Sequence, residues 1–443
     1  MSCHFPPDSS IGALRWQKMA RFAAERGWAM DVIMMAPEEL AGADRSRLSE
    51  LPPGTRLHGL ATPGRPLFAF QLATWRVARR LVGVFRPQSA GPAPSAMSTA
   101  NGHSTSTLGS LRRTFLAAAA FRSADVWTRR AVALGSALAA RTRYACVVSS
   151  GPPHMAHDAG RELGGRLGIP FIMDMRDPWC DADAMPPDFR SERWLRLARE
   201  HESRCVARAA LVVANTSAAE ALLRSRYPAL GASAMTVMNG ADADPLPPSP
   251  NDNRFVIAFA GTLYAGRDPG TLFRAVARVV KERALTPAQL SVEFMGSEGF
   301  GNVPLAEAAR AAGVGEFFTG HSTRPRVEAL AFLARATMLV NLPQDVRLSV
   351  PAKLFEYVRF PAWLLVLSEP GTATEMLFAD TDADVVAPDD VDGIARVISR
   401  HYDAFRASGR PAPLNANGQF DRRVQANRLL DALDRLVADS ARA

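Results

Sequence analysis

The residues with the clearest chemical potential lie between Pro351 and Glu375. Proline opens a short helical pattern that carries Lys353 and Glu356, and an apolar strand pattern over 362–367 leads into a turn of small residues. A lysine near a helix N-terminus is a compact cation that suits a diphosphate, and a carboxylate one turn later can accept hydrogen bonds from ribose hydroxyls. The pattern therefore predicts a nucleotide site. The alternative is an ordinary helix on which both side chains form a solvated ion pair.

The stretch 351–357 resembles the donor-binding signature of the retaining, GT-B-fold glycosyltransferases of family 4, as found in bacteria. The resemblance implies an α/β protein with two Rossmann-like domains that face a central cleft, and a last helix that returns to the N-terminal domain. It also implies that Lys353 faces the diphosphate of a sugar nucleotide, that Glu356 holds its ribose, and that Leu354 belongs to the donor site. The nucleotide sugar is then a substrate, and neither a cofactor nor a metal is expected.

A second part of the donor site is implied where a strand pattern ends at Gly261. The family commonly has Gly-Arg here and a lysine five residues later, both of which grip the departing diphosphate. In this chain Thr262 replaces the arginine and Arg267 stands in the lysine's place, so one cation is lost. The family's other glutamate, eight residues before Glu356, is replaced by Leu348. Whether the protein retains full activity is therefore an open question, and Asp345 or Ser349 is a candidate substitute for this glutamate.

The first half of the chain offers His154 as a candidate catalytic residue beside Arg267 and Lys353. It follows a strand pattern over 144–148 and stands in the first turn of a helix, at the edge where open α/β sheets bind ligands. An imidazole there can donate to a sugar hydroxyl. The resemblance implies contact with the transferred sugar, whereas a packed or capping histidine is the alternative.

Candidate acceptor-side residues lie in two loops. Gly12 and Ala13 belong to a proline-bounded turn over 4–16 that the resemblance places against the diphosphate and the acceptor. Only residues 1–3 precede this turn, too few for a full first strand. Asp174, Arg176 and Asp177 end another strand pattern and are expected to line the cleft. The alternative is a buried ion pair that only holds the loop.

Apolar strand patterns alternate with helical ones, which indicates parallel α/β layers. We expect an N-terminal acceptor-side domain over 1–241 with a mobile loop over 87–110, a linker over 242–253, a nucleotide-sugar domain over 254–419 and a returning helix over 420–443. Strand patterns occupy 30–35, 144–149, 169–173, 211–214, 235–238, 255–260, 290–295, 338–342 and 363–367.

Composition limits the class of protein. The net charge of +8 suits anionic partners, and the four cysteines lack both CxxC spacing and the density of a secreted scaffold. His201 and Cys205, with Cys180, provide too few ligands for a convincing zinc site. Without a leader or a spanning apolar run, the sequence predicts a cytoplasmic protein.

An arginine-rich segment over 71–145 holds eleven arginines and a single acid, Asp125, with aromatic residues between them. It fits helices that lie on an anionic membrane at its inner face, or equally core-facing helices with solvated arginines. No recognition module accompanies it, so nucleic acid is not an expected partner. The leading interpretation is transfer to a lipid-linked or polysaccharide acceptor; the alternatives are a sugar-nucleotide epimerase of the same fold and a non-catalytic subunit that binds membrane or partners.

Overall fold

The computed structural model of the chain describes residues 1–40, 43–61, 107–180, 191–250, 253–263, 268–296, 299–300, 303–342, 347–440 and 442. Contacts divide the chain into two compact units, Met1–Val212 with Leu436–Ala443, and Val213–Arg435. The division falls inside strand β5 (Leu211–Ala214). Most of the loop expected over 87–110 lies outside the described residues, but 107–110 form the start of helix α3 (Thr107–Ala139) rather than a loop.

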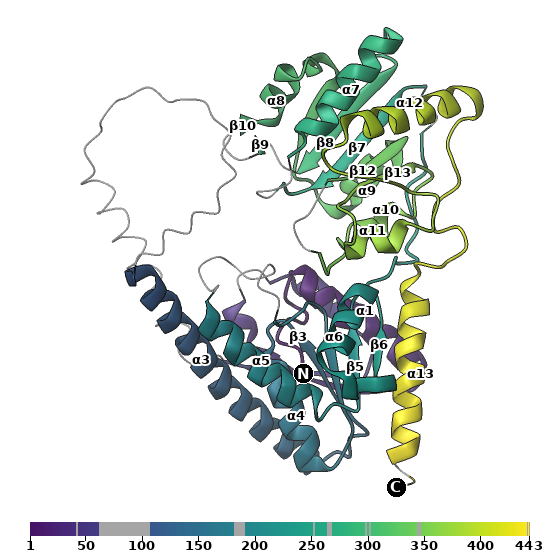
Figure 1. Ribbon diagram of the computed structural model, residues 1–443. Coiled ribbons are helices and arrows are strands. Elements are labelled where there is room, and N and C mark those ends of the chain that lie inside the picture. The colour runs from purple at the N-terminus through teal and green to yellow at the C-terminus, as the bar shows by residue number, and fades with distance from the viewer. Residues whose placement is uncertain are drawn as a thin grey trace. The chain divides into compact units, whose positions relative to one another are not determined.

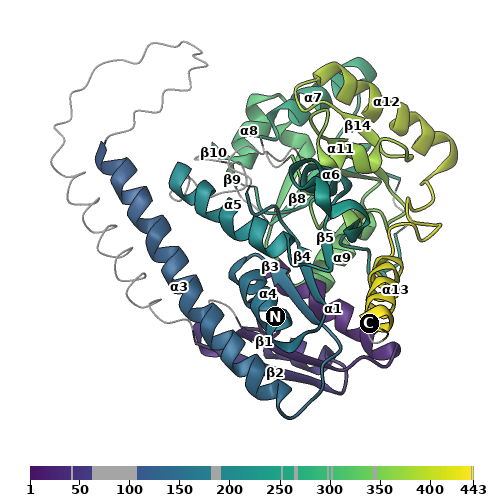
Figure 2. The same ribbon diagram turned by 60° about the horizontal axis from the view of Figure 1, so that its bottom comes forward.

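The strands before residue 237 form a parallel sheet, and the first three residues of the chain belong to it. The Ser2 amide donates to the carbonyl of Ile33, and the Ser150 amide donates to the carbonyl of Met1. This segment therefore lies between two pairs of strands, and Figure 2 shows the amino end among β1 and β3. The other strands of the sheet are β1 (Met30–Met35), β2 (Thr55–Leu60), β3 (Val147–Gly151), β4 (Phe171–Met175), β5 and β6 (Ala234–Thr236).

This arrangement corrects the expectation that residues 1–3 are too few to act as the first strand. Three residues suffice because both edges of the segment are hydrogen-bonded to longer strands. The spatial order becomes β2, β1, residues 1–3, β3, β4, β5 and β6. It is the doubly wound order, in which the direction of chain progression reverses between residues 1–3 and β3.

Helix α3 settles part of the question about the arginine-rich segment. It runs beside α4 (Met155–Leu167) in Figure 1, and the Trp127 side chain is fully buried against that helix and β1. The Phe121 ring lies 5.1 Å from the His201 ring. Arg122, Arg129 and Arg130 are exposed. The described aromatic residues of this helix therefore face the core.

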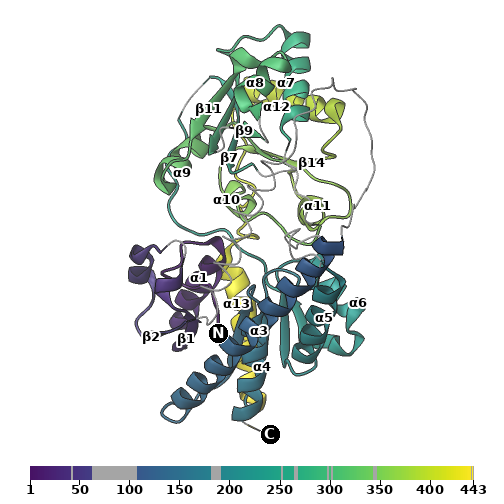
Figure 3. The same ribbon diagram turned by 90° about the vertical axis from the view of Figure 1, so that its left-hand side faces the viewer.

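The remaining helices before β7 have 15 residues or fewer. Figure 3 shows α1 beside β1 and β2. These elements are α1 (Ile11–Glu25), the 3₁₀ segments η1 (Pro37–Glu39) and η2 (Arg45–Glu50), α5 (Glu192–Val206), α6 (Ser217–Arg226) and η3 (Pro228–Ser233).

The second unit contains a six-stranded parallel sheet in the order β11-β8-β7-β12-β13-β14. The chain reverses direction of progression between β7 and β12, again the Rossmann order. Alternate residues of β7 enter separate cores on the two faces of the sheet, Phe255, Ile257 and Phe259 on one and Val256 and Ala258 on the other. The strands are β7 (Phe255–Gly261), β8 (Leu290–Gly296), β11 (Phe318–Ser322), β12 (Met338–Asn341), β13 (Trp363–Leu367) and β14 (Asp384–Val386).

Helices cover both faces of this second sheet, and α7 packs beside α12 (Figure 1). The closing helix buries Leu429, Leu430 and Leu433, whereas Val424 is 44% exposed. Among the described residues, no helix combines the length and apolarity needed to cross a bilayer. The elements are α7 (Gly270–Arg283), the hairpin β9 (Gly299–Phe300) and β10 (Val303–Pro304), α8 (Leu305–Ala311), η4 (Gly315–Phe317), α9 (Arg326–Arg335), α10 (Leu354–Tyr357), α11 (Ala373–Phe378), α12 (Val391–Ser408) and α13 (Arg422–Ser440).

Candidate functional site

In the second unit, Lys353 lies at the point where the sheet reverses. It precedes α10, in the segment after β12, and its side chain reaches back to the carboxyl end of β7. Its Nζ is 3.8 Å from the centroid of the Phe259 ring and would be 3.1 Å from a Cβ at Gly261. Carboxyl ends of strands at such a reversal are where open α/β sheets bind ligands. The structure therefore brings together Lys353 and Gly261, two residues predicted for the donor site.

Two glycines keep this strand edge open. Gly261 has φ +136° and its register partner on β8, Gly296, has φ +118°. A Cβ at Gly296 would lie 2.9 Å from the carbonyl oxygen of Gly261. Side chains are strained in this region of backbone space, so glycine at both positions leaves the main chain accessible beside Lys353.

Helix α10 is fixed to β7 by Tyr357, which the sequence analysis did not single out. Its hydroxyl accepts from the Ala260 amide at 2.8 Å and donates to the Ala260 carbonyl at 3.1 Å. Burial raises the pKa of Tyr357, so the hydroxyl stays protonated. The Leu354 side chain is fully buried, and only its backbone is available for its predicted donor contact. An aromatic residue one position after the candidate carboxylate Glu356 was the available signal.

Glu356 faces the same helix end but has a protein partner. Its Oε1 is 2.7 Å from a guanidinium nitrogen of Arg326; the Glu356 side chain is 24% exposed and that of Arg326 is 57% exposed. An exposed ion pair of this kind is weak enough for a ligand to exchange it. Thr262 directly follows Gly261 at the strand end, whereas Arg267 and Asp345 lie outside the described residues.

Two further details surround this edge. The backbone carbonyl of Leu348, at the place of the family's first glutamate, accepts a hydrogen bond from Thr216 Oγ1 at 2.7 Å. Asn341, at the end of β12, is buried, and its Oδ1 has no partner among the described residues. Such a buried acceptor is uncommon and marks the strand end as polar.

In the first unit, Asp174 is a fully buried structural carboxylate. It accepts from Arg15 Nη2 at 2.8 Å, from Trp16 Nε1 at 2.7 Å and from Ser150 Oγ at 2.9 Å. The Arg15 guanidinium is also buried. Asp174 thus connects α1, β3 and β4 below the strand edge. This agrees with the alternative of a buried ion pair, except that the partner of Asp174 is Arg15.

Arg176 lies above that pair, where it joins the two candidate acceptor loops. Its guanidinium donates to the carbonyl of Gly12 and to that of Pro152. A Cβ at Gly12 would collide with the Arg176 guanidinium, so glycine allows this approach. Ala13 is buried, and Asp177 continues the loop as one of the charges acting on Arg176. Burial lowers the pKa of Arg176.

His154 stands directly before α4 and stacks on Trp179, with ring centroids 4.8 Å apart. Its Nδ1 is buried without a partner among the described residues, as is Nε2 of the neighbouring His157. Both nitrogens lie within 3 Å of the space that a Cβ at Gly151 would fill, at 2.9 and 2.6 Å. Burial lowers the pKa of His154, and it lowers the pKa of His157 to about 3, so both rings are neutral. His154 can therefore donate or accept a hydrogen bond without carrying charge.

The cysteine and histidine considered for zinc have another role. His201 Nδ1 lies 2.6 Å from Asp158 Oδ2, and Cys205 Sγ donates to Asp158 Oδ1 at 3.7 Å. Burial raises the pKa of Cys205, which keeps the thiol protonated. Within the described ranges, no three histidine, cysteine or acidic residues are grouped as metal ligands.

Comparison with solved structures identifies the fold. The sucrose-phosphate synthase of Thermosynechococcus elongatus is similar over 98% of this chain and 96% of that chain, with a TM-score of 0.61 and 12% identity. The chain has the GT-B fold. An α,α-trehalose 6-phosphate synthase of Burkholderia multivorans gives a TM-score of 0.46 and 14% identity, over 72% of this chain and 76% of that chain. A lipopolysaccharide outer core galactosyltransferase, WaaB, gives a TM-score of 0.43 and 14% identity, over 72% of this chain and 79% of that chain. No protein-family model and no curated protein sequence matches the chain.

Proposed function

We propose that this protein is a metal-independent glycosyltransferase, which moves a sugar with retention from a nucleotide-diphosphate donor to a lipid-linked or polysaccharide acceptor. The observation that carries the proposal is the Lys353 side chain over the Gly261 end of β7, at the reversal point of a Rossmann-type sheet. A cation fixed beside exposed main chain can stabilise the charge that develops on a departing diphosphate. The GT-B fold supports this assignment.

Each candidate residue then has a task. Lys353 and Arg267 stabilise the leaving diphosphate, and Glu356 exchanges its ion pair with Arg326 for the ribose hydroxyls. His154 contacts the transferred sugar through Nε2, because its other ring nitrogen is buried. Gly12, held by Arg176, borders the acceptor. Catalysis is electrostatic and positional.

The proposed location is the cytoplasmic face of the membrane, where lipid-linked acceptors are presented. The exposed Arg122, Arg129 and Arg130 of α3 are the described groups that would face anionic lipid. Binding to vesicles of phosphatidylglycerol, but not to vesicles of phosphatidylcholine, is the expected result in a sedimentation assay. Equal sedimentation with both would contradict an electrostatic contact.

The donor site is tested by thermal shift with UDP-glucose, UDP-galactose, UDP-N-acetylglucosamine and GDP-mannose. A donor present at 100 times its Kd stabilises the folded state by about 2.7 kcal/mol. At least one should raise the Tm, and Lys353→Ala combined with Glu356→Ala should abolish that shift. Lys281→Ala is the matched control, because Lys281 is one of the chain's three lysines and lies exposed on α7.

The outcomes separate the possibilities. Equal shifts in the parent and the double variant would move the donor site elsewhere, and no shift with any donor would refute the proposed function. Retention is tested separately by NMR of the product, in which an α-linked donor should give an α-linked glycoside. A β-linked product would contradict retention while leaving glycosyl transfer intact.

A non-catalytic subunit remains the second candidate, because Leu348 occupies the place of the glutamate found in many relatives of the family that the chain resembles. Such a subunit would bind a nucleotide sugar without releasing a nucleoside diphosphate from it. Measured release of UDP or GDP therefore distinguishes the two candidates.

A further inference from the structure

A histidine and a carboxylate that the proposed mechanism does not use, His4 and Asp8, follow the sheet segment formed by residues 1–3. His4 Nδ1 is 2.5 Å from Asp8 Oδ2, and Asp8 Oδ1 accepts the Ser10 amide at 2.8 Å. Asp8 is buried. Burial acts to raise the pKa of Asp8, but the hydrogen bonds from the Ser10 amide and from His4 outweigh it and hold this pKa below its ordinary value. Asp8 is therefore a carboxylate that fixes one nitrogen of the ring.

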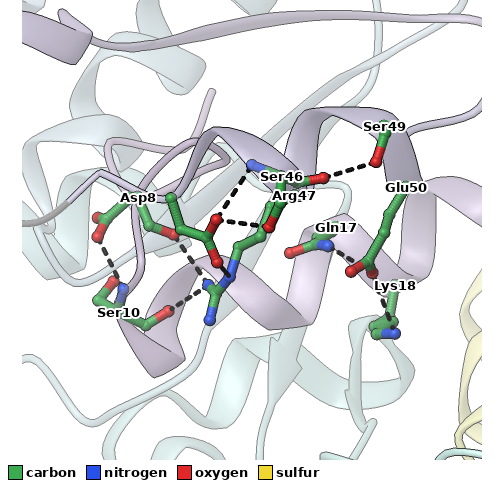
Figure 4. Close-up of polar contacts among 9 residues, drawn as sticks. Asp8, Ser10, Gln17, Lys18, Ser46, Arg47, Ser49 and Glu50 are labelled. Carbon is green, nitrogen blue, oxygen red and sulfur yellow. Dashed lines mark hydrogen bonds and ion pairs between the residues drawn. The ribbon is translucent and has the colours of Figure 1, made fainter. Parts of the chain in front are cut away.

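The loop that carries this pair is held rigidly from outside. Figure 4 shows Arg47, on η2, reaching Asp8 and Ser10; its Nη1 donates to their carbonyls at 2.9 and 3.4 Å. The Asp44 amide donates to the Pro7 carbonyl at 2.7 Å. Since these contacts fix the main chain on both sides of Asp8, the orientation of His4 is set by the fold.

The position of the pair is that of a ligand site. Ser2 pairs in parallel with Ser150, so His4 and the loop that carries His154 leave neighbouring strands at the carboxyl edge of the sheet. This is the reversal point of the first sheet, where open α/β sheets bind ligands. The His4 side chain is 33% exposed, whereas His401, in an equally short pair with Asp384, is 10% exposed. Nε2 of His4 has no hydrogen-bond partner among the described residues and is available to a ligand.

We infer that His4 is a catalytic base which accepts the proton of the acceptor hydroxyl, and that Asp8 is the positioning residue that orients it. The inference rests on the proposed function. To keep the proposed retention, the acceptor oxygen forms its bond to the anomeric carbon on the same face from which the diphosphate departs, and its proton passes to Nε2 of His4. The bond from the anomeric carbon to the diphosphate oxygen breaks, and its electron pair leaves with the diphosphate. The resulting imidazolium faces the Asp8 carboxylate, which stabilises it.

The experiment measures nucleoside diphosphate release from the donor that raises the Tm most, with water alone and with n-octyl β-D-glucoside as acceptor. His4→Gln should lower kcat by about 10²- to 10⁴-fold, the usual contribution of a general base. The donor Kd should not change, since Lys353 and Glu356 remain. His58→Gln is the matched control, because His58 also contacts an aspartate, Asp31 at 2.8 Å, from within a strand.

Asp8→Asn provides a readout that a purely structural role would not produce. Loss of the negative charge removes the group that stabilises the imidazolium, so kcat should fall and the pH profile of kcat should differ from that of the parent. Arg47 and Asp44 contact this loop from the neighbouring segment, and they remain in the variant. In His4→Ala, added imidazole should restore part of the lost rate, which requires a folded protein.

Three results would contradict parts of this account. If the parent releases UDP or GDP and His4→Gln does so at the same rate, the dyad is wrong and the proposed function stands. A folded His4→Ala variant that loses activity without imidazole rescue, together with an unshifted Asp8→Asn profile, would also overturn the dyad. A parent that releases neither nucleotide from any donor it binds would refute the proposed function and the dyad together.

Discussion

Replacement of Asp174 by asparagine is the most demanding test of the first unit. The carboxylate has no exposed surface and accepts hydrogen bonds from Arg15, Trp16 and Ser150. Asparagine keeps the shape but removes the charge, so the buried Arg15 guanidinium loses its counter-ion. Removal of one partner of a buried ion pair costs about 3–5 kcal/mol. At about 2–4 °C per kcal/mol for a unit of this size, Tm should fall by about 6–20 °C.

The assay is urea unfolding followed by tryptophan fluorescence. Six of the seven tryptophans precede Val212, so the signal reports mainly on the first unit. Asp125→Asn is the control, because Asp125 is an exposed acid on α3 and its loss should change the free energy of unfolding by less than about 0.5 kcal/mol. The double variant Arg15→Met with Asp174→Leu should be less destabilised than Asp174→Asn, since it leaves no buried charge. A loss below about 1 kcal/mol in Asp174→Asn would refute this reasoning.

Two further predictions concern one residue each. Gly261→Ala should weaken donor binding by about 5- to 150-fold in calorimetry, because the strained backbone costs about 1–3 kcal/mol and the new methyl group displaces the Lys353 ammonium. Unchanged affinity would mean that the diphosphate does not use this edge. Asp31 accepts from Arg56, Tyr144 and His58, and Arg56 chiefly lowers its pKa. A carboxyl group with a depressed pKa stabilises the fold above its unfolded pKa of about 3.9 and loses that effect as the pH falls further. Urea unfolding at pH 6 and pH 3 should therefore show a smaller difference between parent and Asp31→Asn at pH 3, and a constant difference would contradict the prediction.

The sequence predicted the parallel strands well because strands buried on both faces are continuous apolar runs. All nine expected strands are present, among them β1, β5 and β13 with the expected bounds. Strand β2 was missed because Arg56 and His58 interrupt its apolar pattern, and residues 1–3 were rejected because they are too few. Their membership of the sheet depends on neighbours from distant parts of the chain.

The contrast between local patterns and contacts from distant parts of the chain also applies to the candidate sites. Lys353 and Glu356 lie within one short motif, so local spacing was sufficient to predict them. Asp174 and Arg15 are 159 positions apart, and the support of Asp8 by Arg47 spans 39 positions. Local patterns contain no information about such contacts, which is why Asp174 was assigned to the surface of the site and the role of His4 was not anticipated.

The central claim is that a nucleotide diphosphate binds at the Gly261 edge of β7 beside Lys353. A crystal structure with UDP or GDP, whichever raises the Tm, tests it most directly. The account predicts diphosphate oxygens about 2.7–3.2 Å from Lys353 Nζ, at ordinary hydrogen-bond distance, with the ribose hydroxyls on Glu356. A nucleotide bound elsewhere, with Lys353 still over Phe259 and Glu356 still paired with Arg326, would contradict it.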